Sequence, residues 1–365
     1  MTTSGRSAMG IVSPKSGGII LPEADPKIVQ GSTLRAQHPV AADDYVLPTE
    51  EMYALSDYML DAIRLGLDGA IVYGSSFAGK SFAVSQVAKW FEAENTNDFL
   101  TLKITVDGDK KLLNNFTRYI SHKLGYLPNA KTANNNRVAD NLISSLIYNA
   151  SKHGNKIVLI LDEAEYLTLD HYHVLKSHYN SLQDNGVKLI TFLVGTETLL
   201  NTRKLFEKSG SSGTQISRRL MMGDHQFHAI TDEESLRYAL AGYDKLAYSG
   251  ETFTQHYFPE AWAKGVRMAD LAEDMTAVMK EISGISVLPE FPMGYFTKVA
   301  KALLLYFGKD SSSMNLSGGS MTKEWINIED ITKVMYRLGI EKKLIELSAQ
   351  KIITGKMIAS RNLEA

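Results

Sequence analysis

The chain is organised around the stretch Ile71-Val72-Tyr73-Gly74-Ser75-Ser76-Phe77-Ala78-Gly79-Lys80-Ser81, which matches the pattern G-x-x-x-x-G-K-[ST]. In such a loop, backbone N–H groups surround a polyphosphate, and two glycines let the main chain come close to it. Lys80 supplies a positive charge for the terminal phosphates, and the Ser81 hydroxyl supplies a magnesium ligand. We predict a buried strand before the loop and an amphipathic helix after it. A plain Gly/Ser turn would explain neither Lys80 nor Ser81.

A second apolar run, Lys156 to Leu161, ends in Asp162-Glu163. Its nearly continuous apolar character is typical of a central strand in a parallel sheet. An aspartate at the end of such a strand can hold magnesium, and a neighbouring glutamate can orient and polarise a water molecule. We therefore assign the metal to Ser81 and Asp162 and the activation of water to Glu163. The paired acids favour hydrolysis over the chemistry of a small-molecule kinase or a switch GTPase.

A third apolar run, 187 to 194, ends in Gly195-Thr196. If this strand lies beside the strand before the phosphate loop, Thr196 is placed to contact the γ-phosphate or the attacking water. In isolation, a threonine that caps the next helix is an equally good interpretation.

Two consecutive arginines, Arg218 and Arg219, follow a Gly/Ser-rich segment (209–213) that we expect to be a loop, and they precede an alternating run (226–230). Phosphoryl transfer gains from an arginine placed on the developing negative charge, and oligomeric ATPases commonly take that arginine from the adjacent subunit. One of the two is therefore our candidate for this role, with a solvated surface arginine as the alternative.

The repeated alternation of strands and helices predicts a three-layer α/β domain with a mostly parallel sheet. Thr49, followed by two glutamates, is expected to begin a helix that leads to the first strand. Helical patterns dominate after about residue 231. We therefore divide the chain into a flexible N-terminal arm (1–44), a nucleotide-binding α/β domain (45–230), a helical lid (231–310), and a linker with a C-terminal helical tail (311–365).

The composition indicates a soluble protein. Of 365 residues, 44% are hydrophobic and 22% charged, the formal net charge is −2, and cysteine is absent. The absence of cysteine excludes disulfides and thiolate metal sites and agrees with a cytoplasmic location. No apolar run approaches the length of a membrane span, and no signal pattern is seen at the N-terminus. Three histidines in the helix around 168–184 (His171, His173, His178) have spacings that do not suit one metal ion, so we interpret them as surface or core residues.

With these residues in hand, the chain resembles the AAA+ branch of P-loop ATPases, and within it the transposition helper ATPases of the TnsC, TniB and MuB kind. The resemblance rests on the phosphate loop, the run Leu161-Asp162-Glu163-Ala164-Glu165-Tyr166-Leu167, the strand end Val194-Gly195-Thr196, and Ser217-Arg218-Arg219. It implies a five-stranded sheet with a small helical lid, and ATP and Mg²⁺ as cofactors. It also implies homo-oligomers with shared ATP sites, as rings or filaments on duplex DNA, which link a target-selection protein to the transposase. Some such proteins serve CRISPR-guided transposons. The lid segment 293–298 lacks the arginine often found at the nucleotide, and Lys298 is a possible substitute.

The resemblance also implies contacts to the DNA backbone, from the region after the second strand and from the helix before the acid-bearing strand. Such contacts are independent of base sequence and sensitive to salt. The basic residues in these stretches are Lys103, Lys110, Lys111, Arg118, Lys123, Lys131 and Arg137. For each of them singly, a solvated helix face is the alternative. The C-terminal stretch 341–358 is either a transposase-docking element or a helix packed on its own domain.

Two other functions stay open at this point. One is a signalling or scaffold ATPase that recruits protein partners, such as a secretion-type ATPase or a defence switch. The other is a replication initiator or helicase loader, which would carry a winged-helix domain or a helicase-binding tail.

Overall fold

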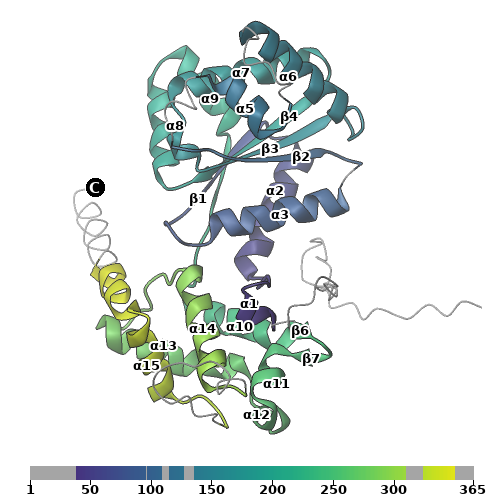
Figure 1. The fold of residues 1–365 in the computed structure, drawn as a ribbon. Coiled ribbons are helices and arrows are strands. Elements are labelled where there is room, and N and C mark those ends of the chain that lie inside the picture. Colours follow the sequence, from purple (N-terminus) through teal and green to yellow (C-terminus); the bar gives the residue numbers. More distant parts are fainter. Residues whose placement is uncertain (1–37, 96, 109–114, 127–134, 310–323, 350–365) are drawn as a thin grey trace, which may run out of the picture.

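The computed structural model describes residues 38–95, 97–108, 115–126, 135–309 and 324–349. The described chain has an α/β part built on a parallel sheet and a helical part that follows it (Figure 1). Most of the expected N-terminal arm, the segment 310–323 and the end of the tail lie outside the described residues.

The sheet has five parallel strands in the order β2-β3-β4-β1-β5. The strands are β1 (Gly69–Tyr73), β2 (Leu100–Thr105), β3 (Lys156–Asp162), β4 (Lys188–Gly195) and β5 (Gly223–Gln226). The two most apolar strands, β3 and β4, lie inside the sheet, as their sequences predict. The predicted parallel five-stranded α/β fold is confirmed.

Helices cover both faces of this sheet, so the α/β part has three layers (Figure 1). One face packs on α2 (Glu50–Leu65) and α3 (Lys80–Glu94). The other face packs on α5 (Phe116–Lys123), α6 (Asn135–Ala150), α7 (Leu169–Asp184), α8 (Thr198–Lys208) and α9 (Ser211–Leu220). Thr49 caps α2 as predicted, because its hydroxyl accepts a hydrogen bond of 3.2 Å from the Met52 N–H. A short 3₁₀ turn, η1 (Ala164–Tyr166), follows β3.

Only Ser209 and Gly210 of the segment 209–213 form the loop that its Gly/Ser composition predicts. Helix α9 already begins at Ser211, and Gly213 is buried in it. A Cβ atom at Gly213 would lie 3.1 Å from the Cα of Phe206 on α8, so the glycine allows these two helices to pack closely. Tertiary packing here outweighs a weak local propensity. Strand β5 ends at Gln226, the first residue of the alternating run 226–230, so most of that run lies outside the strand.

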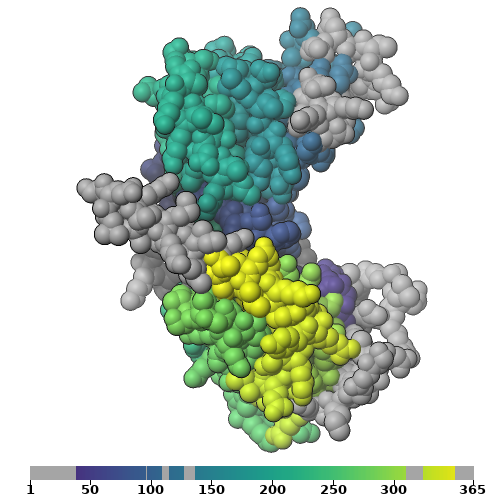
Figure 2. All heavy atoms as spheres, turned by 90° about the vertical axis from the view of Figure 1, so that its left-hand side faces the viewer, coloured from purple at the N-terminus to yellow at the C-terminus, as the bar shows by residue number. Residues whose placement is uncertain are grey.

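The helical part follows Thr231. Its elements are α10 (Glu233–Lys245), α11 (Phe253–Tyr257), α12 (Pro259–Ala263), η2 (Met268–Asp270), α13 (Leu271–Ser283), α14 (Met293–Phe307) and α15 (Ile328–Arg337), with a short hairpin of β6 (Ala247–Tyr248) and β7 (Glu251–Thr252). They share one apolar core. Figure 2 shows α15 and residues 338–349 lying on this helical part. Ile340 and Leu344 are buried in the same core, so the start of the tail packs on its own chain.

Residues 38–44 are packed against the helical part, which differs from the flexible arm that the sequence predicts over 1–44. They include helix α1 (Pro39–Ala42), and Val40 is fully buried in the core of the helical part. The Lys301 amino group on α14 lies 2.6 Å from the Asp43 carboxylate. The chain between α1 and α2 passes the phosphate loop, since Asp43, Tyr45 and Leu47 line one cavity together with it.

Candidate nucleotide-binding site

The phosphate loop joins the end of β1 to the start of α3. Gly79 caps the helix with a φ of 108° and no side-chain hydrogen bond, so the first N–H groups of α3 are left for another acceptor. A Cβ atom at Gly74 would collide with the carbonyl oxygen of Phe227. The backbone angle at Gly79 and the lack of space at Gly74 thus explain why the pattern has glycine at both positions. The backbone of the loop is then free to offer its N–H groups to an anion.

Lys80 lies at the centre of this loop. Its amino group donates hydrogen bonds to the carbonyl oxygens of Gly74 at 2.9 Å and of Ser75 at 2.7 Å. Burial lowers the pKa of Lys80, while the negative charges of Glu165, Glu163 and Asp162 act in the opposite direction. The lysine is therefore held inside the loop, where the terminal phosphates of a nucleotide would meet it.

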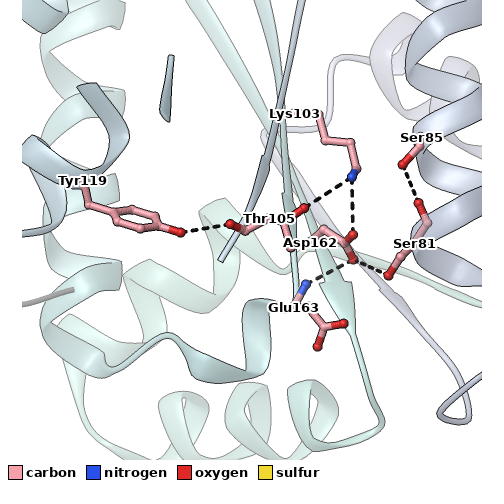
Figure 3. Close-up of polar contacts among 7 residues, drawn as sticks. All are labelled: Ser81, Ser85, Lys103, Thr105, Tyr119, Asp162 and Glu163. Carbon is pink, nitrogen blue, oxygen red and sulfur yellow. Dashed lines mark hydrogen bonds and ion pairs between the residues drawn. The ribbon is translucent and has the colours of Figure 1, made fainter. Parts of the chain in front are cut away.

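The predicted metal ligands come together. Asp162, the last residue of β3, is buried, and its Oδ1 accepts hydrogen bonds from the Ser81 hydroxyl at 3.0 Å and from the Glu163 N–H at 3.1 Å (Figure 3). A hydroxyl and a carboxylate oxygen at this separation fit Mg²⁺, which binds one or two protein oxygens together with substrate phosphates and water. In the described ranges, His, Cys, Asp and Glu side chains form no group of three that could hold a metal ion without a substrate.

Glu163 leaves the strand in the left-handed conformation, with φ 59°. Burial raises the pKa of this carboxyl group, and the charges of Glu165 and Asp162 raise it further. A raised pKa makes a carboxylate a better proton acceptor, so the environment of Glu163 suits the base that we predicted.

Glu165 is a third acid in the site, and our sequence reasoning assigned it no role. It lines the same cavity, and within the described chain its Oε2 is buried without a hydrogen-bond partner. A Cβ atom at Gly195 would collide with this oxygen, so the glycine at the end of β4 leaves room for the carboxylate. The only hint in the sequence is its position two residues after Glu163.

These groups line one cavity of about 650 Å³. Its walls also include residues from distant segments. Met293, Gly294 and Thr297, at the start of α14, belong to the lid segment that the resemblance associates with the nucleotide. The sequence did not predict the others, which are Asp43, Tyr45, Leu47, Thr49 and Met52 from the chain before and at the start of α2, and Phe227 after β5. No local pattern marks the residues before α2 as part of a site. The cavity therefore lies where the α/β part meets the helical part.

Thr196 lines this cavity, and its hydroxyl lies 2.7 Å from the Thr198 hydroxyl. Its predicted role at the γ-phosphate required the strand before Thr196 to lie beside the strand before the phosphate loop, and β4 does pair directly with β1.

Lys298 is not among the residues that line the cavity. It is exposed, and its amino group lies 5.9 Å from the centre of the Tyr295 ring.

Arg218 and Arg219 lie at the end of α9, away from the cavity of their own chain. Helix α9 ends beside Gly69, the first residue of β1, whereas the phosphate loop follows the last residue of that strand. Arg219 donates a hydrogen bond to Oδ1 of Asn180 and lies 4.9 Å from the centre of the Tyr179 ring. Arg218 is exposed. Neither arginine can reach the nucleotide site of the same chain without a large movement.

Four of the seven residues predicted to contact DNA, Lys103, Arg118, Lys123 and Arg137, lie in the described part of the chain. Lys110, Lys111 and Lys131 lie outside the described residues. Arg118 is half-buried on α5, and Arg137 is exposed on the neighbouring α6. Lys123 forms an ion pair of 2.7 Å with Asp107.

Lys103, one of the residues predicted to contact DNA, pairs with a residue of the nucleotide site. Its amino group lies 3.4 Å from Oδ2 of Asp162 (Figure 3). The reason is strand pairing: Thr105 on β2 is in register with Asp162 on β3, so the side chain at 103 shares the face of the sheet that Asp162 occupies.

The three histidines agree with the prediction of surface or core residues. His173 is exposed, whereas His171 and His178 are buried. Burial lowers the pKa of His178 to about 4, and its Nε2 lies 3.1 Å from the Thr117 hydroxyl.

Within the described part of the chain, the helices lack the combination of length and apolar character needed to cross a bilayer.

Comparisons with known proteins agree with this architecture. Residues 68–202 match the AAA domain family. No curated protein matches the chain. Among solved structures, Drosophila ORC bound to DNA is 11% identical, with a TM-score of 0.45 over 87% of this chain and 70% of that chain. Cdc6p from Pyrobaculum aerophilum is 14% identical, with a TM-score of 0.47 over 82% of this chain and 71% of that chain. ORC1 from Aeropyrum pernix in complex with DNA is 12% identical, with a TM-score of 0.40 over 83% of this chain and 87% of that chain. With TM-scores below 0.5, we infer no function from these structures.

The chain therefore has the α/β P-loop AAA+ fold, with a five-stranded parallel sheet and a helical C-terminal region, and residues 68–202 are the part that is similar to the AAA domain family.

Proposed function

We propose that this chain is an ATP-dependent regulator of DNA transposition. It binds duplex DNA through the backbone, without sequence preference, and assembles on it as a ring or filament that connects a target-selection protein to the transposase. Residues 45–230 form its nucleotide-binding domain and 231–310 its lid. The observation that carries the ATPase part is the convergence of Lys80, Ser81, Asp162 and Glu163 on one cavity. The transposition part rests on the resemblance of the motifs to the TnsC, TniB and MuB group.

The residues of the cavity suit hydrolysis of ATP. The N–H groups of the phosphate loop and the Lys80 amino group bind the phosphates, and Ser81 with Asp162 would hold Mg²⁺. When bound, Mg²⁺ neutralises charge on the phosphate oxygens. Glu163 orients a water molecule and accepts its proton, which its raised pKa favours. Thr196, at the end of the neighbouring strand, is placed to contact the γ-phosphate or that water.

We further propose that each site is completed by a second copy of the chain. Arg218 and Arg219 lie at the opposite end of β1 from the phosphate loop, on the surface of the α/β part. An arginine there lies too far from the phosphate loop of its own chain to act on its nucleotide, so in an assembly it would serve the site of an adjacent subunit. Because Arg219 is already held by Asn180 and the Tyr179 ring, Arg218 is the better candidate for the arginine finger. ATP would then act as an assembly signal, and hydrolysis would favour release from DNA.

The decisive experiment is electron microscopy of the protein with duplex DNA and a non-hydrolysable ATP analogue. We expect rings or filaments on DNA that require the analogue and whose formation falls steeply with added salt, because the contacts are to phosphates. The matched control is Lys80→Ala, which should bind no nucleotide and form no assembly. If wild-type protein binds the analogue but never assembles on DNA, the proposal is wrong, and a scaffold or signalling ATPase becomes the better interpretation. Assembly only on a particular DNA sequence would favour a replication initiator.

A further inference from the structure

The metal-binding aspartate has a positively charged neighbour that the function proposed above does not use. Lys103 places its amino group 3.4 Å from Oδ2 of Asp162, while Oδ1 of the same carboxylate accepts the hydrogen bonds from Ser81 and Glu163. The Asp162 side chain is 3% exposed and that of Lys103 is 22% exposed. The two oxygens of Asp162 therefore have separate partners, one on the side of α3 and one on β2 (Figure 3).

The position of Lys103 is fixed by the sheet. Strand β2 is an edge strand, paired on one side with β3, and Lys103 is in register with Ile160, two residues before Asp162. Side chains alternate along a strand, so residues 103 and 105 and their register partners 160 and 162 all lie on the face that carries α3. A lysine at this position has the length to reach the end of the neighbouring strand.

The end of β2 is itself held in place. The backbone carbonyl of Thr105 accepts a hydrogen bond of 2.9 Å from the Tyr119 hydroxyl, and that hydroxyl accepts one of 2.9 Å from the Asp107 N–H. The Lys103 amino group also donates a hydrogen bond of 3.4 Å to the Thr105 hydroxyl. Lys103 thus extends from a rigid strand end and has a second acceptor available when it leaves Asp162.

We infer that Lys103 is a positioning residue for the metal ligand: it pairs with Oδ2 of Asp162 before magnesium and nucleotide bind, and its charge opposes magnesium at the same carboxylate. The inference rests on the proposed nucleotide function. A buried carboxylate without a counter-charge is unfavourable, so the ion pair with Lys103 stabilises the Asp162 side chain in the orientation that directs Oδ1 toward Ser81. A divalent cation and an ammonium group beside one carboxylate repel each other, so Lys103 also weakens the binding of Mg²⁺.

The test is a titration with MgCl₂ of the binding of a fluorescent ATP analogue to the full-length protein. For Lys103→Met, we expect half-maximal Mg²⁺-dependent binding at a concentration lower than for wild type by roughly three- to tenfold. In the presence of EDTA, the same variant should bind the analogue more weakly than wild type, because the uncompensated charge of Asp162 repels the phosphates. Lys103→Arg keeps the charge and should behave like wild type.

Two comparisons make the result specific. Lys123→Met removes the ion pair with Asp107 on the same side of the molecule but does not touch Asp162, and it should leave the Mg²⁺ dependence unchanged. If Lys103→Met does not fold, Lys103→Gln removes the charge while keeping a hydrogen-bond donor, and the same shift is expected for it.

The outcomes separate this inference from the proposed function. If wild-type protein binds no analogue at any Mg²⁺ concentration, the nucleotide function itself is wrong. If wild type binds with a clear Mg²⁺ dependence and the uncharged variants show the same midpoint, Lys103 has no role at the metal site. An equal shift in Lys123→Met would also overturn the inference, since it would point to a general change in charge.

Discussion

Replacing Gly195 by alanine should displace the Glu165 carboxylate from the nucleotide site. Gly195 is the last residue of β4, and its backbone is not in the left-handed region, so an alanine meets no conformational barrier there. The added Cβ would lie 2.9 Å from Cδ1 of Leu199 and 3.1 Å from Cδ of Glu165, and closer still to Glu165 Oε2. Ordinary contacts of a Cβ atom are 3.4 to 4 Å, so the carboxylate has to move.

The size of the effect follows from that overlap. Forcing one extra methyl group into a packed interior costs about 1–3 kcal/mol. A loss of about 2 kcal/mol in a domain of this size lowers the thermal midpoint by roughly 4–8 °C. Glu165 is a neighbouring charge of both Lys80 and Glu163, so its displacement also disturbs the catalytic groups. A misplacement of about 1 Å can reduce turnover on the order of a hundredfold.

Thermal unfolding and steady-state ATP hydrolysis of Gly195→Ala, Glu165→Ala and the double variant would test this reasoning. Glu165→Ala alone removes a buried oxygen that has no hydrogen-bond partner in the described part of the chain, so it should not destabilise the fold. In the double variant the contact with Glu165 is gone and the contact with Cδ1 of Leu199 remains, so the midpoint should recover part of the loss caused by Gly195→Ala. A midpoint of Gly195→Ala equal to that of wild type, or no recovery in the double variant, would refute the proposed steric conflict.

Three further predictions concern the chemistry, the subunit contact and the stability of the α/β part. Glu163→Gln should slow hydrolysis by roughly 10²- to 10⁴-fold, while binding of the ATP analogue stays unchanged. With ATP, this variant should remain trapped as an assembly on DNA. Fast turnover in this variant would exclude Glu163 as the base. Arg218→Ala should lower turnover of the assembled protein without changing nucleotide binding by isolated subunits, whereas Arg219→Ala should mainly lower the thermal midpoint, because Arg219 holds Asn180 and Tyr179. The third prediction is a pH dependence: because the pKa of His178 is lowered to about 4 in the fold, the unfolded chain takes up a proton first as the pH falls below about 6.5. The free energy of unfolding should then drop by about 2 kcal/mol by about pH 5, and urea titrations of His178→Gln should lack this loss.

The parts of the site that could be predicted from sequence are contiguous. The phosphate loop, the acid pair Asp162-Glu163 and the cap at Thr49 each depend on residues within a few positions of one another. Backbone geometry over such a short distance is set by the residues themselves, so the sequence pattern and the structure agree. The Gly/Ser-rich segment 209–213 shows the limit: its composition predicts a loop, but packing of Gly213 against Phe206 supports a helix.

The sequence by itself determined that the chain has a parallel α/β fold and a loop for nucleotide phosphates, because periodicity and loop composition are local properties. Only the tertiary structure decided which distant residues complete the site. Strand register brings Lys103 to Asp162, the end of β4 brings Gly195 to Glu165, and the segment before α2 brings Tyr45 to the cavity wall. The physical reason is that pairing between strands and packing between layers depend on the whole core, and no window of a few residues contains that information.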